Sequence, residues 1–443
     1  MPPRDKAAAK LMGPAKPIGP AKPTGPAPLT APLAAAKAGQ AARAVERWFA
    51  ENRRELSWRT NYADAAHPPG TAARDPWLCL MAEAMLQQTQ VSRVIEYLAR
   101  FGAAFPTPAA MASAPESTVL AMWAGLGYYR RARNLRNAAV EIVARFGGEV
   151  PTTAAELATL PGVGRYTAGA IASIVFGHRE PLVDGNVARV LLRLTGDQAD
   201  PTERRTIDRL WTQATALVAR AAAPGLLNEG LMELGALICT PAPSTPRCDQ
   251  CPLASLCVAR AQGLTGAIPA GKPGRAKAKP IIYADAVVCR DARGRLLLHK
   301  RASTGLWADM WQVPTVESIS SGATLQRLAA ELDATGLTIA GRFVHQTTHR
   351  EIRFVVWRAK SVAKPAGAVW LAAADLASVA ISNAAKRAIS IGLDTVHGKP
   401  SAVQQVKPAK FAKDAKSAKP AKPAKPAKSV AKRSRKSAPR PAR

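Results

Sequence analysis

Two carboxylates lie in sequence settings that suggest acid–base chemistry. Glu83 lies in MAEAMLQQTQ, where nearly every close neighbour is apolar. A carboxylate buried in such a helix is destabilised when ionised, so its pKa tends upward and it can serve as a general acid. Asp184 in PLVDGNVARV directly precedes a helical pattern, a place where aspartate is most often an N-cap. A reaction through an oxocarbenium-like state needs one protonated and one ionised carboxylate, although both residues also have purely structural interpretations.

Four of the six cysteines fall within nineteen residues, with the spacing C-x8-C-x2-C-x5-C. They are Cys239, Cys248, Cys251 and Cys257. In a long chain such a dense cluster indicates metal binding rather than disulfides. Four thiolates can hold zinc or a [4Fe–4S] cluster. The x2 gap followed by x5 differs from the paired C-x2-C arms of most zinc ribbons, and it favours the [4Fe–4S] cluster.

The stretch LPGVGRYTAGA places Gly162 and Gly164 in a turn between two helical segments, the second beginning near Thr167. A P-loop is excluded because no Gly-Lys-Ser/Thr follows, and a dinucleotide-binding turn because Thr167 occupies its third glycine position. Backbone N–H groups exposed at the start of a helix bind anions. In a basic chain this turn predicts contact with a DNA phosphate, and a plain helix corner is the alternative.

The chain is strongly basic. Among its 443 residues Lys and Arg outnumber Asp and Glu by 62 to 31, which gives a net charge of +31. Residues 1–40 and 399–443 contribute +5 and +14 of this charge, and the body between them keeps +12. A basic body indicates a polyanionic partner, most often nucleic acid. The sequence shows neither a secretory signal nor a membrane-spanning stretch, so we expect a cytoplasmic protein without a membrane partner.

The elements that must position these groups fall into two regions with different patterns of apolar residues. Residues 40–262 carry apolar residues at helical spacing, as in NVARVLLRL, which predicts an all-α domain. Residues 281–395 carry short β-rich runs such as IIYADAVVCR together with helical pieces, which predicts a smaller α+β domain. The Ala/Pro/Lys-rich remainder predicts a disordered tail at 1–39, a linker at 263–280 and a disordered basic tail at 396–443.

Several motifs in order resemble the adenine DNA glycosylase (MutY) family of helix-hairpin-helix glycosylases. They are LSWR, EAMLQQTQV, GLGYYRRARNL, LPGVGRYTAGA, VDGNVARV, LNEGLMELGALIC and the four cysteines. The resemblance covers about residues 40–395 and implies a multidomain protein, in which a helix-hairpin-helix glycosylase domain with a [4Fe–4S] loop precedes a Nudix-like domain. It implies a base-excision repair enzyme that hydrolyses the N-glycosidic bond of adenine mispaired with 8-oxoguanine or guanine in double-stranded DNA. Such an enzyme is expected to act as a monomer.

The resemblance assigns the chemistry to four residues. Glu83 is expected to protonate the adenine ring and to help activate water, and Asp184 to stabilise the sugar cation with the support of Asn186. Tyr166 stands where lyase-type relatives have a lysine, and a tyrosine cannot form the Schiff base that leads to strand cleavage. The enzyme is therefore expected to be monofunctional, releasing the base and leaving the backbone intact, with the Tyr166 hydroxyl near Asp184.

The resemblance also implies two sets of DNA contacts. The adenine, flipped out of the stack, is expected in a pocket lined by Arg54, Trp58, Arg59, Leu86 and Glu229. Gln88 and Tyr128 are expected to fill the space beside the partner base, and the two hairpin glycines to bind a phosphate. Further phosphate contacts are expected from Arg130, Arg131 and Arg133.

The β-rich region resembles the C-terminal Nudix-like domain of the family. Nucleotide hydrolysis in that fold needs the metal-binding pattern R-E-x-x-E-E-x-G, whereas RLAAELDATG offers only Glu331 and Asp333, out of register. The region is therefore expected to read the lesion rather than to hydrolyse nucleotides. Its reading loop is expected in FVHQTTHRE, with Thr348 and His349 sensing 8-oxoguanine and with Thr347 where a phenylalanine is usual.

Two departures from the family pattern remain. The first cysteine gap is x8 where x6 is usual, and the stretch NYADAAHPPGTAARD between Trp58 and Glu83 is longer than usual, with no role that the sequence assigns.

Three alternative functions are weaker. A glycosylase with lyase activity on oxidised pyrimidines conflicts with Tyr166, a non-catalytic iron–sulfur DNA-binding protein conflicts with the pair Glu83 and Asp184, and a nucleotide pyrophosphatase lacks its metal carboxylates.

Overall fold

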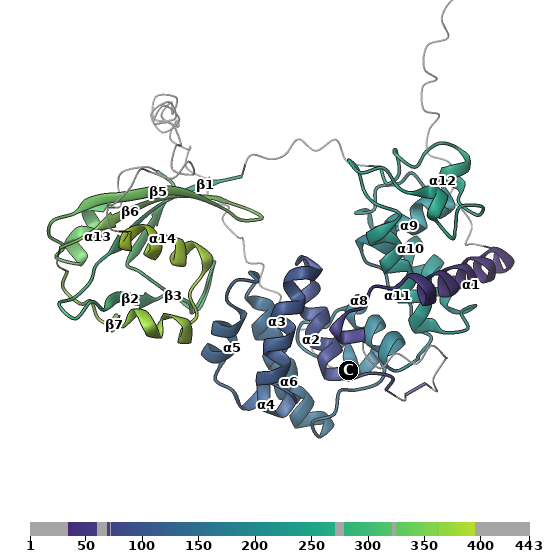
Figure 1. Ribbon diagram of the computed structural model, residues 1–443, viewed down its shortest axis with the longest axis horizontal. Coiled ribbons are helices and arrows are strands. Elements are labelled where there is room, and N and C mark those ends of the chain that lie inside the picture. The colour runs from purple at the N-terminus through teal and green to yellow at the C-terminus, as the bar shows by residue number, and fades with distance from the viewer. Residues whose placement is uncertain are drawn as a thin grey trace, which may run out of the picture.

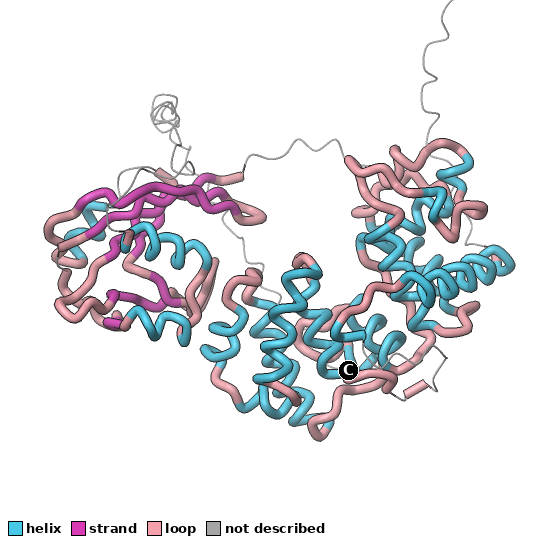
Figure 2. Tube along the Cα trace, viewed as in Figure 1, coloured by secondary structure: helices cyan, strands magenta, loops and turns pink. Residues whose placement is uncertain are grey.

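The computed structural model describes residues 34–59, 69–70, 72–270, 279–320, 325–360 and 362–394. Two domains follow one another along the chain, a helical one up to residue 270 and one built on β-strands from residue 279 (Figure 1). In Figure 2 the helices, in cyan, make up the first domain, and the strands, in magenta, lie in the second. The predicted fold class, an all-α domain followed by an α+β domain, is confirmed.

The helices of the first domain pack into two hydrophobic cores. They are α1 (Ala35–Asn52), α2 (Pro76–Leu86), α3 (Val91–Ala104), α4 (Pro108–Ser113), α5 (Glu116–Trp123), α6 (Arg130–Phe146), α7 (Ala154–Leu157), α8 (Arg165–Ala170), α9 (Gly185–Thr195), α10 (Arg204–Val218), α11 (Pro224–Leu237) and α12 (Val258–Ala261), with the short helices η1 (Ser57–Arg59), η2 (Ile171–Val175) and η3 (Cys248–Gln250). One core lies among α2 to α8 around Met81 and Trp123, and the other joins α1 to α9–α12 around Val45 and Leu191. The second half of the helical hairpin, α8 and η2, passes between the two cores.

Helix α2 carries Glu83 and is buried nearly all round. Asp75 caps its first turn, since the Oδ1 atom accepts a hydrogen bond from the backbone N–H of Leu78 at 3.0 Å, and Pro76 occupies the first helical position. No residue of α2 is fully exposed, which fits the apolar surroundings of Glu83 in the sequence. A helix of this kind brings any polar side chain that it carries into the protein interior.

The glycine turn links α7 to α8. Gly162 has a left-handed backbone, φ +79°, and a Cβ atom there would come within 2.6 Å of the Asn134 side chain, so only glycine fits. Gly164 is the N-cap of α8, which therefore begins at Arg165, slightly earlier than the sequence pattern suggested. After one and a half turns the helix widens into the π-helix η2, a feature often found beside functional sites.

The described part of the second domain has two sheets, two α-helices and one short 3₁₀-helix. The strands are β1 (Ile281–Val288), β2 (Leu296–Lys300), β3 (Trp311–Gln312), β4 (Thr315–Ser318), β5 (Thr338–Gln346), β6 (Glu351–Arg358) and β7 (Val369–Leu371), and the helices are α13 (Leu325–Glu331), the short η4 (Ala373–Ser378) and α14 (Asn383–Leu393). One sheet has the order β4-β1-β6-β5, with β1 and β6 parallel, and the other has the order β3-β2-β7. Helix α14 packs against β1, β5 and β6. The loop between β5 and β6 holds the predicted reading residues.

The two domains contact each other directly. Met310 of the second domain is fully buried and belongs to the first core of the helical domain. Arg133 of α6 donates from Nη2 to the carbonyl oxygen of Ala308 at 2.5 Å. The hydroxyl groups of Tyr128 and Thr348 lie 2.5 Å apart, so a residue predicted to contact the partner base in one domain touches such a residue of the other domain.

The N-terminal boundary differs from the sequence prediction. Helix α1 begins at Ala35, inside the segment 1–39 that was predicted to be disordered. Alanine has the highest helix propensity, and Ala38 is fully buried against the second core. Burial of these small side chains explains why the folded region starts earlier than the composition suggests.

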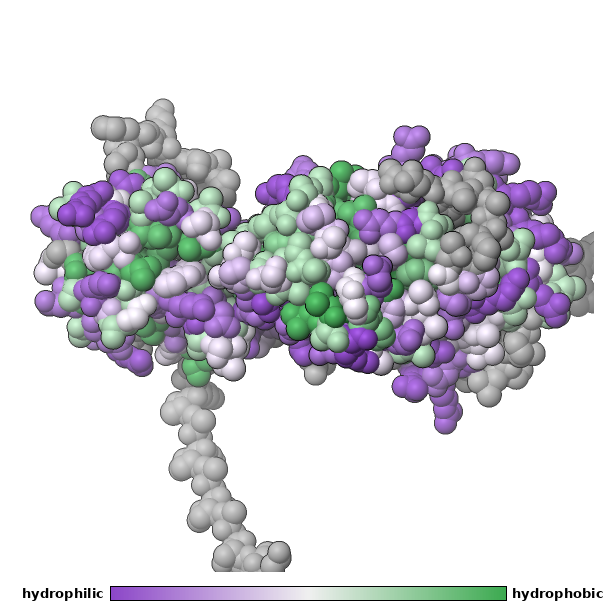
Figure 3. Space-filling view, turned by 90° about the horizontal axis from the view of Figure 1, so that it is seen from below, coloured by the Kyte–Doolittle hydropathy of each residue, from purple (hydrophilic) through white to green (hydrophobic). Residues whose placement is uncertain are grey.

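The predicted linker also begins later than its composition suggests. Ile268 is 1% exposed within the second core, and its carbonyl oxygen accepts a hydrogen bond from Arg193 Nε at 2.8 Å. Residues 271–278 of the predicted linker and nearly all of both predicted tails lie outside the described residues. Polar and apolar side chains are interspersed over the face seen in Figure 3, as on most protein surfaces. Of the helices in the described ranges, none is at once long and apolar enough to span a membrane.

Candidate active site

A cavity of about 510 Å³ opens between the two helical cores. Its walls come from η1, α2, α8, η2, the start of α9 and α11. It gathers ten residues predicted for catalysis, base binding or partner-base contact: Arg54, Trp58, Arg59, Glu83, Leu86, Gln88, Tyr166, Asp184, Asn186 and Glu229. The other predicted residues, which are expected to contact DNA or to hold a metal cluster, lie outside it. The cavity is therefore where the predicted chemistry can take place.

Glu83 lines this cavity from α2, in surroundings that favour its protonated form. Burial is the largest cause, and it raises the pKa of the carboxyl group to about 7. The interaction with the Tyr166 hydroxyl lowers this pKa, while the neighbouring carboxylates of Asp184 and Glu229 raise it. A group with a pKa near the working pH can both give and take a proton, as a general acid must.

Asp184 is held as a hydrogen-bond acceptor at the start of α9. Its Oδ1 accepts from the backbone N–H of Val187 at 2.7 Å, and its Oδ2 accepts from Asn186 Nδ2 at 3.1 Å. Burial raises the pKa of Asp184, and these two donors oppose the rise. Asn186 is fixed in turn by Arg189, which donates to Asn186 Oδ1 at 2.8 Å and to the carbonyl oxygen of Cys239 at 2.7 Å. Asp184 is thus an N-cap and a cavity residue at once.

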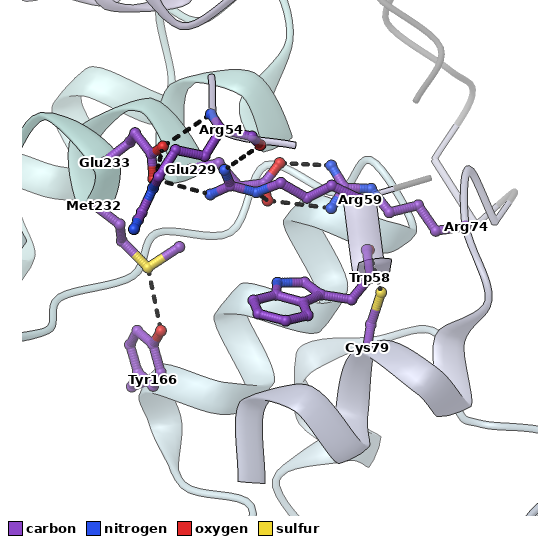
Figure 4. A network of polar contacts seen from close by, with 9 residues as sticks. All are labelled: Arg54, Trp58, Arg59, Arg74, Cys79, Tyr166, Glu229, Met232 and Glu233. Carbon is purple, nitrogen blue, oxygen red and sulfur yellow. Dashed lines mark hydrogen bonds and ion pairs between the residues drawn. The ribbon is translucent and has the colours of Figure 1, made fainter. Parts of the chain in front are cut away.

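Tyr166 lines the cavity from the first turn of α8, beside both carboxylates. Its hydroxyl donates to Met232 Sδ at 3.2 Å (Figure 4). Burial above all, and then the charges of Glu83 and Asp184, raise the pKa of the phenol well above its usual value. The hydroxyl therefore keeps its proton at any working pH, and it offers hydrogen bonding where a lysine would offer a nucleophile.

Three arginines and two glutamates close one end of the cavity (Figure 4). Arg54 donates from Nε and Nη2 to the two oxygens of Glu233, at 2.8 Å each, and Arg59 bridges Glu229 at 3.0 Å and Glu233 at 3.3 Å. Arg74 donates to both oxygens of Glu229, at 3.1 and 2.5 Å. Burial raises the pKa of Glu233, but the bonds from Arg54 and the charge of Arg59 outweigh it and lower the pKa. Forked pairs of this kind fix the orientation of both partners.

Arg74 and Glu233 are site residues that the sequence analysis missed. Glu233 follows Glu229 by four residues on α11, the spacing that puts two side chains on one helix face. Glu233 could therefore have been predicted from the sequence as a neighbour of Glu229. Arg74 comes at the end of the unassigned extra stretch, 155 positions from its partner Glu229, and no local pattern indicated it. The backbone N–H of Ala73 donates to the carbonyl oxygen of Val175 at 2.9 Å, which fixes this end of the stretch against η2.

The predicted phosphate contacts on α6 divide into two groups. Arg130 is exposed at the start of the helix, where a DNA contact remains open to it. The prediction for Arg131 is wrong, because its guanidinium is buried and donates to five backbone carbonyls and one hydroxyl of the protein. A guanidinium satisfied in this way is not available to a phosphate. Arg133 is half-buried, and its guanidinium joins Glu116 at 2.9 Å to the second domain; its contact with a phosphate stays a prediction.

The remaining residues predicted to contact DNA are accessible. Gly162 and Gly164 are exposed at the hairpin turn, and Thr348 and His349 are exposed in the loop between β5 and β6. Gln88 and Tyr128 are exposed too, and both have a left-handed backbone although neither is glycine. All of these assignments stay predictions.

The four clustered cysteines line one hollow beside α9 and α12, and all four are free thiols. Within the described part of the chain, no three His, Cys, Asp or Glu side chains converge on a point as a single metal ion requires. Arg193 Nη1 lies 3.2 Å from the Sγ atom of Cys239, so a guanidinium stands beside this hollow.

Comparison with known proteins identifies the family. Residues 81–215 match the HhH-GPD superfamily of base excision DNA repair proteins, and residues 285–390 match the NUDIX domain. The chain is 35% identical over 401 residues to adenine DNA glycosylase of Homo sapiens, covering 78% of this chain and 72% of that protein. The chain belongs to the adenine DNA glycosylase family. It is 39% identical over 258 residues to the adenine DNA glycosylase of Mycolicibacterium smegmatis, covering 58% of this chain and 79% of that protein.

Membership of the adenine DNA glycosylase family confirms several predictions. The chain is a DNA glycosylase of base excision repair, with a helix-hairpin-helix domain and a C-terminal Nudix domain. Its macromolecular partner is DNA, and membership of the family suggests an iron–sulfur cluster. The solved structure of a thermostable thymine-DNA glycosylase has 27% sequence identity and a TM-score of 0.44, covering 51% of this chain and 98% of that one.

Proposed function

We propose that this glycosylase hydrolyses the N-glycosidic bond of adenine mispaired with 8-oxoguanine or guanine in double-stranded DNA, as a monomer in the cytoplasm. The observation that carries the proposal is the pairing of two unlike carboxylates in one cavity. Glu83 has a pKa of about 7, whereas Asp184 accepts hydrogen bonds at both oxygens. One acid can therefore donate a proton while the other stabilises a cation.

The steps follow from these protonation states. Glu83 donates its proton to a ring nitrogen of adenine, the bond between the sugar and the base breaks, and its electron pair leaves with the base. The sugar is left as an oxocarbenium-like cation, which the Asp184 carboxylate stabilises with Asn186 holding its orientation. Water then adds to the sugar carbon and gives a proton to the Glu83 carboxylate, which restores the acid for the next turnover.

The base pocket is formed by the network of arginines and glutamates together with Trp58 and Leu86. Glu229 supplies carboxylate oxygens, which accept hydrogen bonds from an exocyclic amino group, and the arginines hold it in place. The ring of Trp58 offers a flat apolar face for the flipped base. Adenine has the amino group that such an acceptor requires.

The proposed enzyme releases the base without cutting the strand. Strand cleavage by a glycosylase needs an amine that attacks the sugar, and the side chain at the corresponding place in the hairpin is the phenol of Tyr166. The raised pKa of this phenol keeps it neutral. The expected product is an abasic site in an intact backbone.

The cofactor that we propose is a [4Fe–4S] cluster held by Cys239, Cys248, Cys251 and Cys257. The hollow that they share, their free thiols and the nearby guanidinium of Arg193 fit such a group. The cluster would tie the C-terminal end of the helical domain together, a structural role. The carbonyl oxygen of Cys239 accepts from Arg189, so the cysteine loop also supports the residues around Asp184.

The partner base is proposed to be read from both domains. Gln88 and Tyr128 would occupy the space beside it from the helical domain, while Thr348 and His349 would sense 8-oxoguanine from the Nudix domain. Arg130 and the hairpin turn would hold phosphates. The 2.5 Å contact between the hydroxyls of Tyr128 and Thr348 supports this assignment, because it puts the two reading surfaces next to each other.

The test is single-turnover release of adenine by the cluster-loaded full chain. Duplexes carry one adenine opposite 8-oxoguanine, guanine or thymine, and strand scission is scored with and without a later alkali step. We expect release opposite 8-oxoguanine and guanine, little opposite thymine, and scission only after alkali. Absence of release from all three duplexes would refute the proposal, and scission without alkali would refute its monofunctional part.

A further inference from the structure

Gln88 and Tyr128 share an unusual backbone conformation. Their φ angles are +57° and +49°, in the left-handed region that non-glycine residues seldom adopt. Gln88 follows the end of α2, and Tyr128 precedes the start of α6, so they come from different segments of the helical domain. Such conformations persist only where the surrounding structure holds them, and they gather at functional sites.

The group that holds both segments is the buried guanidinium of Arg131. Its Nη1 atom donates to the carbonyl oxygens at the end of α2, including that of Gln87 at 2.6 Å. Its Nη2 atom donates to the hydroxyl of Thr89 at 3.1 Å and to the carbonyl oxygen of Gly127 at 3.2 Å. It therefore bonds the residues on both sides of Gln88 and the residue directly before Tyr128.

We propose that Arg131 is a positioning residue for partner-base recognition, which sets the spacing and orientation of Gln88 relative to Tyr128 through one shared guanidinium. The inference rests on the proposed function, since it takes these two residues as the ones beside the partner base. The guanidinium carbon also lies 5.5 Å from the centre of the Tyr128 ring, so Arg131 contacts the side chain as well as the preceding backbone.

A purely structural role explains only part of this arrangement. The last carbonyls of a helix lack partners within it, and an arginine that bonds those of Ala84 and Met85 would cap α2. The bonds to Thr89 and Gly127 lie beyond that helix end and are not needed for a cap. The planar fork of an arginine can reach both segments at once, whereas a lysine has one compact ammonium group and must lose most of these bonds.

The test is the variant Arg131→Lys in the cluster-loaded full chain, with Arg136→Lys as the matched control. Arg136 lies on the same helix and also donates to backbone carbonyls, those of Ala114 at 2.9 Å and Ala112 at 3.4 Å. These two residues lie at the C-terminal end of α4, away from Gln88 and Tyr128. Both variants keep the positive charge and lose the planar guanidinium. They differ only in which backbone segments lose their hydrogen bonds to it.

The readout is a ratio of two single-turnover rates in one protein sample. One duplex has adenine opposite 8-oxoguanine, and the other has adenine opposite an abasic-site analogue, which has no base for the two residues to contact. Partial unfolding or a low active fraction lowers both rates equally and cancels in the ratio. We expect Arg131→Lys to lower the ratio at least tenfold and Arg136→Lys to leave it within about twofold of the wild type.

An unchanged ratio in folded Arg131→Lys, or an equal fall in both variants, would overturn the inference. If Arg131→Lys does not fold, Thr89→Val decides, because it removes one acceptor of the guanidinium beside Gln88 and keeps the side-chain volume. We then expect a smaller fall in the same ratio, and no fall would overturn the inference. Failure of the proposed function is a different result, in which the wild-type enzyme itself releases no adenine.

Discussion

The raised pKa of Glu83 predicts how adenine release depends on pH. The step that breaks the glycosidic bond requires the protonated carboxyl group, so its rate follows the fraction of enzyme in which Glu83 carries a proton. Burial raises the pKa of this group to about 7, well above the range of an exposed glutamate. The single-turnover rate should therefore be nearly constant below about pH 6 and should fall as the pH rises through 7.

The size of the effect follows from the pKa. Above pH 7 the protonated fraction falls by about a factor of ten for each pH unit, so the rate at pH 9 should be about 100-fold lower than at pH 6. A limb at low pH should appear where Asp184 becomes protonated, and burial raises the pKa of that group and so moves the limb upward from the usual position. Glu83→Gln should lose about 100- to 10,000-fold in rate, the usual contribution of a general acid.

The assay is a pH series of single-turnover rates at saturating enzyme, with Glu83→Gln measured alongside on the same duplex. The residual rate of that variant should lack the fall above pH 7, and duplex binding should be kept in both proteins. A wild-type rate that stays flat to pH 9, while chemistry limits it, would contradict the assignment of Glu83 as the acid. A residual Glu83→Gln rate with the same fall above pH 7 would place the titrating group elsewhere.

Three further predictions concern stability, the pocket and the domain contact. The folded-state pKa of Glu83 lies above the unfolded value, so the wild type loses stability as the pH rises from about 4.5 to 7. The free energy of unfolding of Glu83→Gln minus that of the wild type, measured in urea, should therefore be about 2 kcal/mol larger at pH 8 than at pH 5.5. An equal difference at both pH values would refute this. Arg74→Met breaks a buried pair with Glu229, and it should lower the free energy of unfolding by about 3 kcal/mol and slow adenine release in single-turnover assays, whereas unchanged rates would exclude a role in the pocket. Arg133→Ala removes the bond to Ala308 and should raise the radius of gyration in X-ray scattering, and an unchanged radius would show that apolar packing alone docks the domains.

Much of the fold could be predicted because its causes are local. Helical periodicity, the glycine turn and the switch to β-rich runs each depend on residues within a few positions of one another. The boundaries were less predictable, because Ala35 and Ile268 belong to segments whose composition indicates disorder. What folds these segments is burial against the second core, which composition does not report.

The site shows the same division between local and distant causes. Asp184 could be assigned as an N-cap from its neighbours, and Glu83 as an acid from the apolar residues around it. Arg74 could not be found, since its partner lies on a distant helix. Arg131 was assigned to DNA from the family resemblance, whereas tertiary packing turns its guanidinium inward. Charge in the sequence indicates that cations are present and does not indicate which of them face solvent.

The distribution of charge in the cavity explains why the proton belongs on Glu83. The charged residues that line it are Arg54, Arg59, Arg74, Glu83, Asp184, Glu229 and Glu233. Three guanidiniums thus face four carboxylates, and one proton on the acids makes the set neutral. Glu229 and Glu233 are bonded to arginines, and Asp184 accepts from an amide and a backbone N–H, while Glu83 has the phenol of Tyr166 beside it. The proton is therefore retained on Glu83, where burial and the charges of Asp184 and Glu229 outweigh the opposing charge of Arg59.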